Sequence, residues 1–310
     1  MTTPQLSIAL RTYSAEDPGT WQPVLDHARA ADAAGVDRVL VSDHVVLGEH
    51  LDAYGRPESG GVVGGKQPTG PDGHWLEALT TLSVVCGMTS RVRLGTNILI
   101  AALRRPVVLA KSAATLDVLS GGRLDLGVGI GWQREEYEAA GLDFGERGRQ
   151  LDLTLEVCQT LWREPRAQVD LPGLAFEAIH MMPKPSQPGG VPIWVSGRIN
   201  ERVARRLARF GSGWIPWGED ADDLVGSIPR MRDAVAAAGG DADAIQVAGM
   251  LPAVRRQDRG IDFDATMERV PSLVDAGVTD FRAYLPVPSP YDAAVEYLRG
   301  IADAFHEATR

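Results

Sequence analysis

The chain has 310 residues, a formal net charge of −10 and 44% hydrophobic residues, enough to bury one large core or two modest ones. The acidic balance disfavours nucleic acids and anionic membranes as partners. No stretch approaches the roughly 20 apolar residues of a membrane span, and the N-terminus does not read as a signal peptide. We therefore expect a cytoplasmic protein in which Cys86 and Cys158 are buried thiols.

Short apolar runs alternate with helical patterns along the whole chain. A first strand is predicted at 6–10, a helix from Trp21 that ends at Gly35, and a second strand at 37–42. Further strands are predicted at 92–99, 124–128, 193–196, 214–217, 245–250 and 281–285, and helices at about 74–88, 106–119, 133–162, 198–209, 222–238 and 294–305. Eight alternating strands favour a single (β/α)8 barrel of the TIM type over residues 1–310, with an open doubly wound sheet as the alternative.

Two regions interrupt this alternation. Residues 48–73 hold eight glycines and no apolar period, which is typical of a long loop that covers a site or forms an insert. Residues 171–188 look like a small extended insertion before the strand at 193–196. Neither region has the character of a linker between domains.

Candidate chemical groups follow the second and third strands. The active site of a parallel barrel lies at the carboxyl ends of its strands, where Asp43 and His44 follow one strand and Thr96, Asn97 and Ile98 end the next. An imidazole there can exchange a proton near neutral pH, although an ordinary loop histidine fits the pattern equally well. Zinc is disfavoured because no thiolate or helically spaced second histidine accompanies His44, so we predict no metal site.

Two other patterns suggest ligand contacts. Ser196, Gly197 and Arg198 precede a basic helix, an arrangement that fits an anion site or a plain strand-to-helix turn. Trp75, Trp132 and Trp217 belong to a set of tryptophans that either fills the core or walls a pocket for a flat apolar ring. The run from Gly127 to Gly131 has the spacing G-x-G-x-G, which differs from the dinucleotide fingerprint.

Taken in order, these segments resemble the bacterial luciferase-like superfamily of flavin- and deazaflavin-dependent oxidoreductases. The resemblance is carried by VSDH (41–44), RLGTNIL (93–99), LDVLSGGRL (116–124), LGVGIGW (126–132) followed by EEY (135–137), PKP (183–185) and VPIWVSG (191–197). It runs from the first strand to at least Gly218, whereas the part beyond about residue 240 matches only in its alternation of strands and helices.

The resemblance implies a barrel with a cofactor ring across its C-terminal rim. The peptide bond Asn97–Ile98 would be cis and would back the ring together with Thr96, while Gly129 and Gly131 would lie beneath it. Ser196, Gly197 and Arg198 would hold the cofactor phosphate. The sequence is most similar to the branch that uses the deazaflavin coenzyme F420, in which His44 would give or take a proton and Asp43 would contact the ring or orient the imidazole.

One departure concerns the substrate. Sugar-phosphate dehydrogenases of the F420 branch carry a glutamate after the crest glycines, whereas this chain has Trp132. We therefore expect a flatter, more apolar substrate in a pocket formed by Trp75, Trp132 and Trp217. Seven cations are candidate partners for the phosphate and acidic tail of F420: Arg104, Arg105, Lys111, Arg198, Arg202, Arg205 and Arg206.

The main alternative is an FMN-dependent monooxygenase of the same superfamily, which receives reduced flavin from a partner reductase. A non-redox barrel enzyme and a non-catalytic cofactor-binding protein are more remote alternatives. The resemblance also allows a homodimer.

Overall fold

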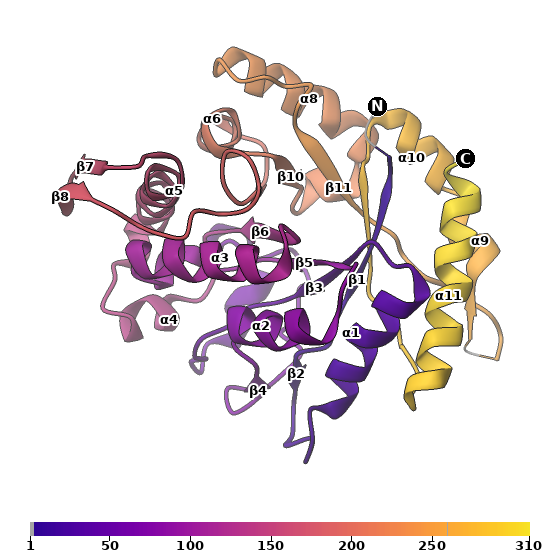
Figure 1. Ribbon diagram of the computed structural model, residues 1–310. Coiled ribbons are helices and arrows are strands. Elements are labelled where there is room, and N and C mark those ends of the chain that lie inside the picture. The colour runs from indigo at the N-terminus through magenta and orange to yellow at the C-terminus, as the bar shows by residue number, and fades with distance from the viewer. Residues whose placement is uncertain (1–2, 259) are drawn as a thin grey trace.

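A closed barrel of eight parallel strands forms the centre of the molecule in the computed structural model, which describes residues 3–258 and 260–310 (Figure 1). The order around the barrel is β1-β14-β11-β10-β9-β6-β5-β3. These strands are β1 (Gln5–Ala9), β3 (Arg38–Val41), β5 (Arg93–Thr96), β6 (Leu124–Val128), β9 (Ile193–Ser196), β10 (Gly213–Ile215), β11 (Gln246–Met250) and β14 (Asp280–Ala283). The predicted (β/α)8 fold is confirmed.

Pairing between the first and last strands closes the barrel. β1 lies parallel to β14, with Gln5 opposite Asp280, and parallel to β3 on its other side, with Ser7 opposite Arg38. Each strand is thus hydrogen-bonded on both edges, and the alternative of an open doubly wound sheet is wrong. Closure also places the carboxyl ends of all eight strands around one rim.

Helices surround the strands on the outside of the barrel (Figure 1). They are α1 (Gln22–Ala34), α2 (Ala78–Met88), α3 (Pro106–Ser120), α4 (Arg134–Ala139), α5 (Arg147–Arg163), α6 (Glu201–Phe210), α7 (Glu219–Asp222), α8 (Leu224–Ala237), α9 (Phe263–Met267), α10 (Val270–Ala276) and α11 (Tyr291–Ala308). α1 packs beside α11, so the two ends of the chain are joined through helices as well as through strands. Each helix buries one face, as Leu151, Leu155, Cys158 and Trp162 of α5 illustrate.

Several of the predicted helix boundaries are wrong. The helix expected at 133–162 is two helices, α4 and α5, because Gly141 adopts a left-handed φ of +71° and ends the first of them. The helix expected from residue 74 begins only at Ala78, where the Glu77 side chain caps it by accepting from Thr80 N. Polar capping side chains also set the starts of α6, at Asn200, and of α8, at Asp223.

Three short two-stranded sheets lie outside the barrel. β2 (Tyr13–Ser14) pairs with β4 (His74–Trp75), β7 (Ala167–Leu171) with β8 (Leu174–Ile179), and β12 (Val254–Arg255) with β13 (Ile261–Asp262). The β7–β8 hairpin is the insertion expected near 171–188, and it begins a few residues earlier than predicted. The 48–73 loop contains two short 3-10 helices, Leu51–Gly55 and Pro57–Ser59.

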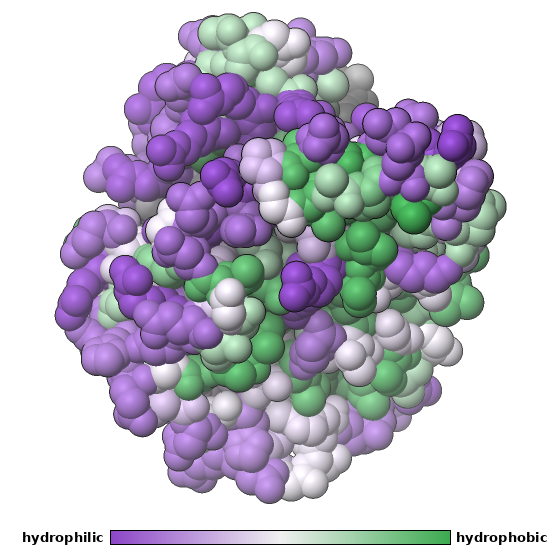
Figure 2. Space-filling model, turned by 90° about the vertical axis from the view of Figure 1, so that its left-hand side faces the viewer, coloured by the Kyte–Doolittle hydropathy of each residue, from purple (hydrophilic) through white to green (hydrophobic). Residues whose placement is uncertain are grey.

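The surface on the β7–β8 side is mixed in character. Hydrophobic areas occupy its centre, and hydrophilic residues surround them (Figure 2). Among the described residues, no helix combines the length and the apolar character needed to cross a membrane. Both cysteines are buried, as predicted, and burial raises the pKa of the Cys158 thiol.

Candidate active site

The predicted site residues of four neighbouring strands meet at the C-terminal rim of the barrel. β3 leads into Asp43 and His44, β5 into Asn97, β6 into Gly129, and β9 ends at Ser196. These four strands are consecutive in the order β9-β6-β5-β3, so residues as far apart in the chain as Asp43 and Ser196 come to lie on the same part of the rim. The peptide bond Asn97–Ile98 is cis, as the resemblance implies.

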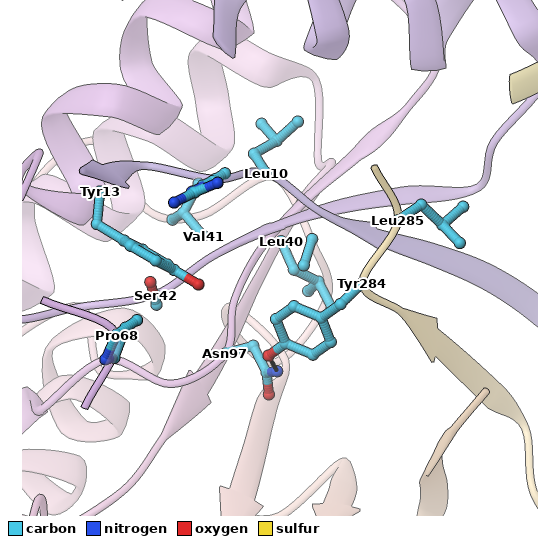
Figure 3. Close-up of a pocket in the computed structure, with 11 residues that line it drawn as sticks. Leu10, Tyr13, Leu40, Val41, Ser42, Pro68, Asn97, Tyr284 and Leu285 are labelled. Carbon is cyan, nitrogen blue, oxygen red and sulfur yellow. Dashed lines mark hydrogen bonds between the residues drawn. The ribbon is translucent and has the colours of Figure 1, made fainter. Parts of the chain in front are cut away.

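Two cavities open at this rim on either side of one hydrogen-bonded pair. Asn97 Nδ2 donates to Tyr284 Oη over 2.9 Å, and both residues line both cavities. The larger cavity, about 520 Å³, is also lined by Arg282, Trp217 and Arg198. The smaller, about 220 Å³, has Tyr284 and Asn97 on one side and Tyr13, Ser42 and Pro68 on the other (Figure 3).

A carboxylate on α4 holds the imidazole of His44. Glu136 Oε2 lies 3.0 Å from His44 Nδ1, and Glu136 Oε1 accepts a hydrogen bond of 2.8 Å from Val45 N. Both side chains are shielded from solvent, with 9% of His44 and 1% of Glu136 exposed. A carboxylate at Nδ1 assigns the proton of a neutral imidazole to that atom and leaves Nε2 as the acceptor. The sequence pattern did not indicate a role for Glu136, because α4 comes close to the end of β3 only in the folded chain.

We expect Glu136→Gln to lower kcat about 10–100-fold, less than the ~10²–10⁴ that a lost acid–base group costs. Glutamine cannot accept from Nδ1–H with a full negative charge, so it holds the imidazole more weakly than the carboxylate does. The measurements are kcat and the dissociation constant of the cofactor for both proteins.

Glu135→Gln is the matched control, because Glu135 is the adjacent residue and contacts the exposed His50 instead. A loss of cofactor binding as large as the loss of turnover would instead indicate a purely structural role for Glu136.

Asp43 does not contact the imidazole. Its buried carboxylate accepts from Ile100 N over 2.9 Å and from Arg104 Nη2 over 2.8 Å, and Arg104 also pairs with Glu77. The suggested orientation of His44 by Asp43 is therefore wrong, because Asp43 ties the end of β3 to the segment after β5. Glu136 is the residue that orients the ring.

Aromatic rings cover His44 on the outer side of the rim. The rings of Trp75 and Trp132 lie edge-on to the imidazole, with centroids at 4.7 and 5.8 Å. Trp75 stacks on Tyr13 at 4.5 Å, and Trp132 contacts Tyr54 of the 48–73 loop at 5.3 Å. His44 consequently lies behind this aromatic wall and lines neither cavity.

The 48–73 loop folds over the rim and contacts it at several points. Trp217 Nε1 donates to Gly60 O over 3.2 Å, and Trp75 Nε1 donates to Thr69 Oγ1 over 3.0 Å. The three tryptophans predicted to form the pocket therefore all lie at the rim: Trp217 lines the larger cavity, while Trp75 and Trp132 flank His44.

The predicted anion site at the end of β9 has most of its backbone donors already engaged. Gly197 N donates to Ile215 O, and Ile199 N donates to Asp220 Oδ2 over 2.6 Å. Asn200 accepts from the first amides of α6. The Arg198 guanidinium lines the larger cavity and is paired with the exposed Glu219 at 3.1 Å. An anion bound at this segment would therefore be held by side chains and not by the helix N-terminus.

Packing between strands accounts for part of the glycine pattern after β6. A Cβ atom on Gly127 would lie 2.0 Å from Thr96 O, and one on Gly129 would lie 2.9 Å from Ile98 Cδ1. Gly131 has a φ of +66° beside Ile100. Thr96 is buried and donates to Gly127 O over 2.7 Å, so its hydroxyl serves the contact between β5 and β6. Gly129 and Gly131 leave room for the side chains of Ile98 and Ile100 to pack against this segment.

Most of the seven predicted cations are paired within the protein. Arg104, Arg198, Arg205 and Arg206 form ion pairs with carboxylates, and Lys111 donates to Met182 O. Arg282, a cation that the sequence analysis did not select, lines the larger cavity. In the sequence, the indication of a role for Arg282 is its position as the only charged residue in the run 281–285. Among the described residues, no group of three or more His, Cys, Asp or Glu side chains could hold a metal ion.

The chain belongs to the luciferase-like monooxygenase family, whose model matches residues 5–261. An uncharacterized protein of Mycobacterium tuberculosis is 30% identical over 270 residues, which cover 86% of this chain and 88% of that protein. The F420-dependent glucose-6-phosphate dehydrogenase of Kineococcus radiotolerans is 31% identical over 220 residues, 69% of this chain and 58% of that enzyme.

Solved structures of several enzymes share the fold. The monooxygenase RslO1 from Streptomyces bottropensis has a TM-score of 0.71 at 22% identity, covering 99% of this chain and 100% of that one. An F420-dependent secondary alcohol dehydrogenase has a TM-score of 0.74 at 16% identity, covering 98% and 99%. The chain therefore shares its fold with a monooxygenase and with an F420-dependent dehydrogenase.

Proposed function

We propose that this protein transfers a hydride between coenzyme F420 and a small, flat or apolar organic substrate. The observation that carries the proposal is the His44–Glu136 pair, a buried carboxylate and an imidazole held at a strand end among aromatic rings. This pair can move a proton at Nε2, and hydride reduction of a carbonyl or similar group needs such a proton. The name of the Kineococcus relative supports F420 as the cofactor.

The larger cavity fits a cofactor of this kind. Its volume of about 520 Å³ lies within the range of roughly 300–1,000 Å³ that is usual for ligand pockets. Asn97 and Arg198 both line it, so one ligand could contact both. In the smaller cavity, the buried Ser42 hydroxyl has no hydrogen-bond partner among the described residues. A buried polar group without a partner is expected where a ligand would supply the missing hydrogen bond.

We assign ring contacts to Asn97, Ile98 and Gly129, and phosphate contacts to the side chains of Ser196 and Arg198; Gly197, whose N–H donates to Ile215 O, is left out of the phosphate site. When bound, F420 would supply the carbon that gives or accepts the hydride. Glu136 fixes the imidazole, and His44 Nε2 gives or takes the proton. Trp75 and Trp132 flank the imidazole, and their apolar faces favour a flat substrate over a sugar phosphate. Because these rings cover His44, we infer that a substrate displaces one of them, or the loop that carries Tyr54.

An FMN-dependent monooxygenase is the second candidate, and a solved neighbour in complex with FMN supports it at the level of fold. In that case a partner reductase would supply reduced flavin. A homodimer and the single-domain organisation over residues 1–310 are further parts of the proposal.

A turnover assay tests the proposed reaction. Reduced F420 is mixed with the protein and a panel that contains flat aromatic ketones and enones, aliphatic ketones and sugar phosphates, and the return of absorbance of the oxidised cofactor is followed. We expect oxidation of the cofactor with the flat, apolar members. Turnover of sugar phosphates alone would contradict the substrate assignment, and turnover only with reduced FMN and oxygen would favour the second candidate.

A further inference from the structure

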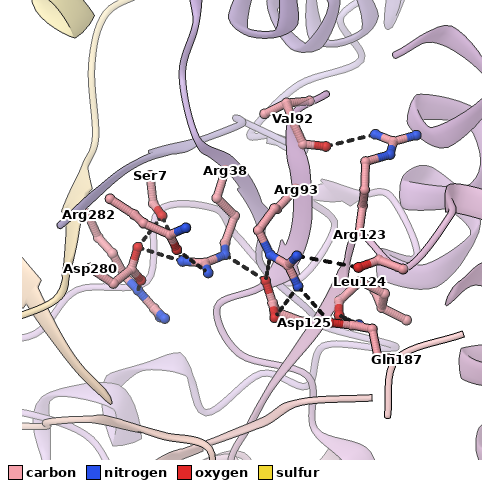
Figure 4. A network of polar contacts seen from close by, with 12 residues as sticks. Ser7, Arg38, Val92, Arg93, Arg123, Leu124, Asp125, Gln187, Asp280 and Arg282 are labelled. Carbon is pink, nitrogen blue, oxygen red and sulfur yellow. Dashed lines mark hydrogen bonds and ion pairs between the residues drawn. The ribbon is translucent and has the colours of Figure 1, made fainter. Parts of the chain in front are cut away.

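The hydrogen-bonded pair of Asn97 and Tyr284, which lines both cavities, leaves one hydroxyl proton without an acceptor. Arg282 Nη1 donates to Asn97 Oδ1 over 2.6 Å, and Arg282 is held in turn by Asp280 within a network of buried ion pairs (Figure 4). A guanidinium can only donate, so it holds the carbonyl oxygen of the Asn97 amide and leaves the NH2 group to face Tyr284. The Tyr284 hydroxyl therefore accepts from Asn97 Nδ2, and its own proton has no acceptor among the described residues.

A second free hydroxyl faces Tyr284 across the smaller cavity. Tyr13 follows β1 and Tyr284 follows β14, the neighbouring strand, and both residues line the cavity. Their hydroxyl ends point toward each other from opposite sides (Figure 3). The Tyr13 hydroxyl has no hydrogen-bond partner among the described residues, and its oxygen is not buried. Two phenolic protons are thus available to one ligand atom between them.

The electrostatic surroundings favour these phenols as donors to an oxygen that gains negative charge. Tyr284 is 52% exposed through the cavities that it lines, yet burial of its phenol at the rim raises its pKa and outweighs Asn97 and Arg282, which lower it. The Tyr284 phenol therefore stays protonated at neutral pH. Among the described residues that line the smaller cavity, the charged one is the cation Arg11, so no carboxylate there opposes an oxyanion.

The apolar part of the lining limits the size of the ligand. Leu10, Leu40, Val41 and Leu285 line the smaller cavity, whose volume is about 220 Å³. An apolar cavity of about 150 Å³ holds one benzene molecule, so this cavity accommodates a single six-membered ring with a short substituent. The ligand that fits best is one flat, largely apolar ring that carries a carbonyl oxygen.

We propose that the smaller cavity binds a cyclic enone with its carbonyl oxygen between Tyr13 and Tyr284, and that these two phenols make the enzyme specific for conjugate reduction. The inference rests on the proposed function, in which the reduced cofactor supplies the hydride. Two electrons arrive with the hydride at the β-carbon, and the electron pair of the carbon–carbon double bond moves toward the carbonyl oxygen to give an enolate. Protonated His44 then gives its Nε2 proton to the α-carbon, and the product is the saturated ketone.

The separate positions of the phenols and the imidazole favour an enone over a simple ketone. In the reduction of a ketone the oxygen itself takes the proton, so the oxygen would have to lie at His44, which lines neither cavity. In conjugate reduction the oxygen and the protonated carbon are different atoms of one ring. Tyr13 stacks on Trp75, and Trp75 contacts His44, so the imidazole lies one aromatic ring beyond the oxygen site. Donors aimed at a developing oxyanion stabilise such a transition state.

Product analysis with reduced F420 and cyclohexenone tests the proposal on the wild-type protein. We expect cyclohexanone, whereas the allylic alcohol would overturn the inference, because the oxygen would then be the protonated atom. Tyr13→Phe and Tyr284→Phe should each lower kcat by about 10²–10³-fold, as the loss of one oxyanion donor does. Tyr291→Phe is the matched control and should leave kcat unchanged, because the Tyr291 ring contacts Arg29 on the outside of the barrel.

A binding measurement with para-nitrophenol tests the phenol pair without a cofactor. The anion of this one-ring probe carries its charge on an oxygen, as an enolate does, and its absorbance distinguishes it from the neutral form. Wild-type protein should bind the anion at least tenfold more tightly than the neutral phenol, which lowers the pKa of the bound probe by one unit or more. Tyr13→Phe and Tyr284→Phe should each lose most of this preference, whereas Tyr291→Phe should retain it.

The two measurements separate the possible failures. Equal binding of the two forms of para-nitrophenol by wild-type protein that reduces cyclohexenone would overturn the role of the phenols and leave the proposed function in place. Preference for the anion without turnover of any enone, with either F420 or FMN, would overturn the proposed function and conjugate reduction with it.

Discussion

Replacing His44 with alanine should lower kcat by about 10²–10⁴-fold, the usual contribution of a positioned acid–base group. Cofactor affinity should change little, because His44 lines neither cavity and contacts only Glu136 and the surrounding aromatic rings. The measurement is steady-state turnover together with a cofactor binding titration on the same preparation. Loss of turnover with retained binding separates a chemical role from a failure to fold.

The control for this variant is His50→Ala. His50 also contacts a glutamate of α4, Glu135, but its side chain is 81% exposed and lies on the 48–73 loop. The His50→Ala variant should keep turnover within a few-fold of the wild-type value. Unchanged turnover in His44→Ala would remove the imidazole from the reaction and favour a protein that only binds the cofactor.

Replacing Asp280 with asparagine should lower the free energy of unfolding by about 3–5 kcal/mol, which is typical when one partner of a buried ion pair is removed. Asp280 is fully buried and accepts from Arg38, Arg282 and Ser7. An amide would leave two buried guanidiniums opposite a neutral group. Because domains are stable by only about 5–15 kcal/mol, urea unfolding should reveal the change readily.

Asp26→Asn is the control, because its pair with Arg29 lies on the surface of α1 at 3.4 Å. Exposed pairs contribute only about 0–1 kcal/mol, so the midpoint of unfolding should barely move. If Asp280→Asn lowered the free energy of unfolding by no more than Asp26→Asn does, the buried ion pairs of Asp280 would not stabilise the fold.

The same carboxylate predicts a dependence of stability on pH. Burial alone would raise the pKa of Asp280, but Arg38 and Arg282 outweigh burial and lower it. A group whose pKa is lower in the folded state stabilises the fold above its unfolded value, near 3.9, and loses this contribution as the pH falls toward its folded value. We therefore expect wild-type stability to fall in acid below about pH 4, and Asp280→Asn to show a smaller fall there.

The alternation of apolar runs and helical patterns was sufficient to predict the barrel. The order of the strands follows because connections between parallel strands are right-handed. Residues that follow the strands, such as His44 and Asn97, must then lie at the C-terminal rim. Helix boundaries were harder, because the α4–α5 break depends on the φ of Gly141 and the start of α2 depends on a cap from Glu77.

Partnerships between side chains could not be read from the order of residues. Asp43 stands next to His44 in the sequence, yet strand geometry turns its carboxylate toward Arg104, and a helix 92 residues away supplies the carboxylate for the imidazole. Arg282 was not predicted because its contact with Asn97 forms only when the barrel closes, and the sequence does not show that the two residues meet. Its contact with Asp280 likewise depends on the geometry of the folded strand.

A binding titration with both candidate cofactors distinguishes F420 from FMN. Purified protein freed of bound ligand is titrated separately with F420 and with FMN, and the change in cofactor fluorescence is followed to saturation. We predict saturable binding of F420 that is at least tenfold tighter than that of FMN. Tight binding of FMN with no binding of F420 would contradict the account.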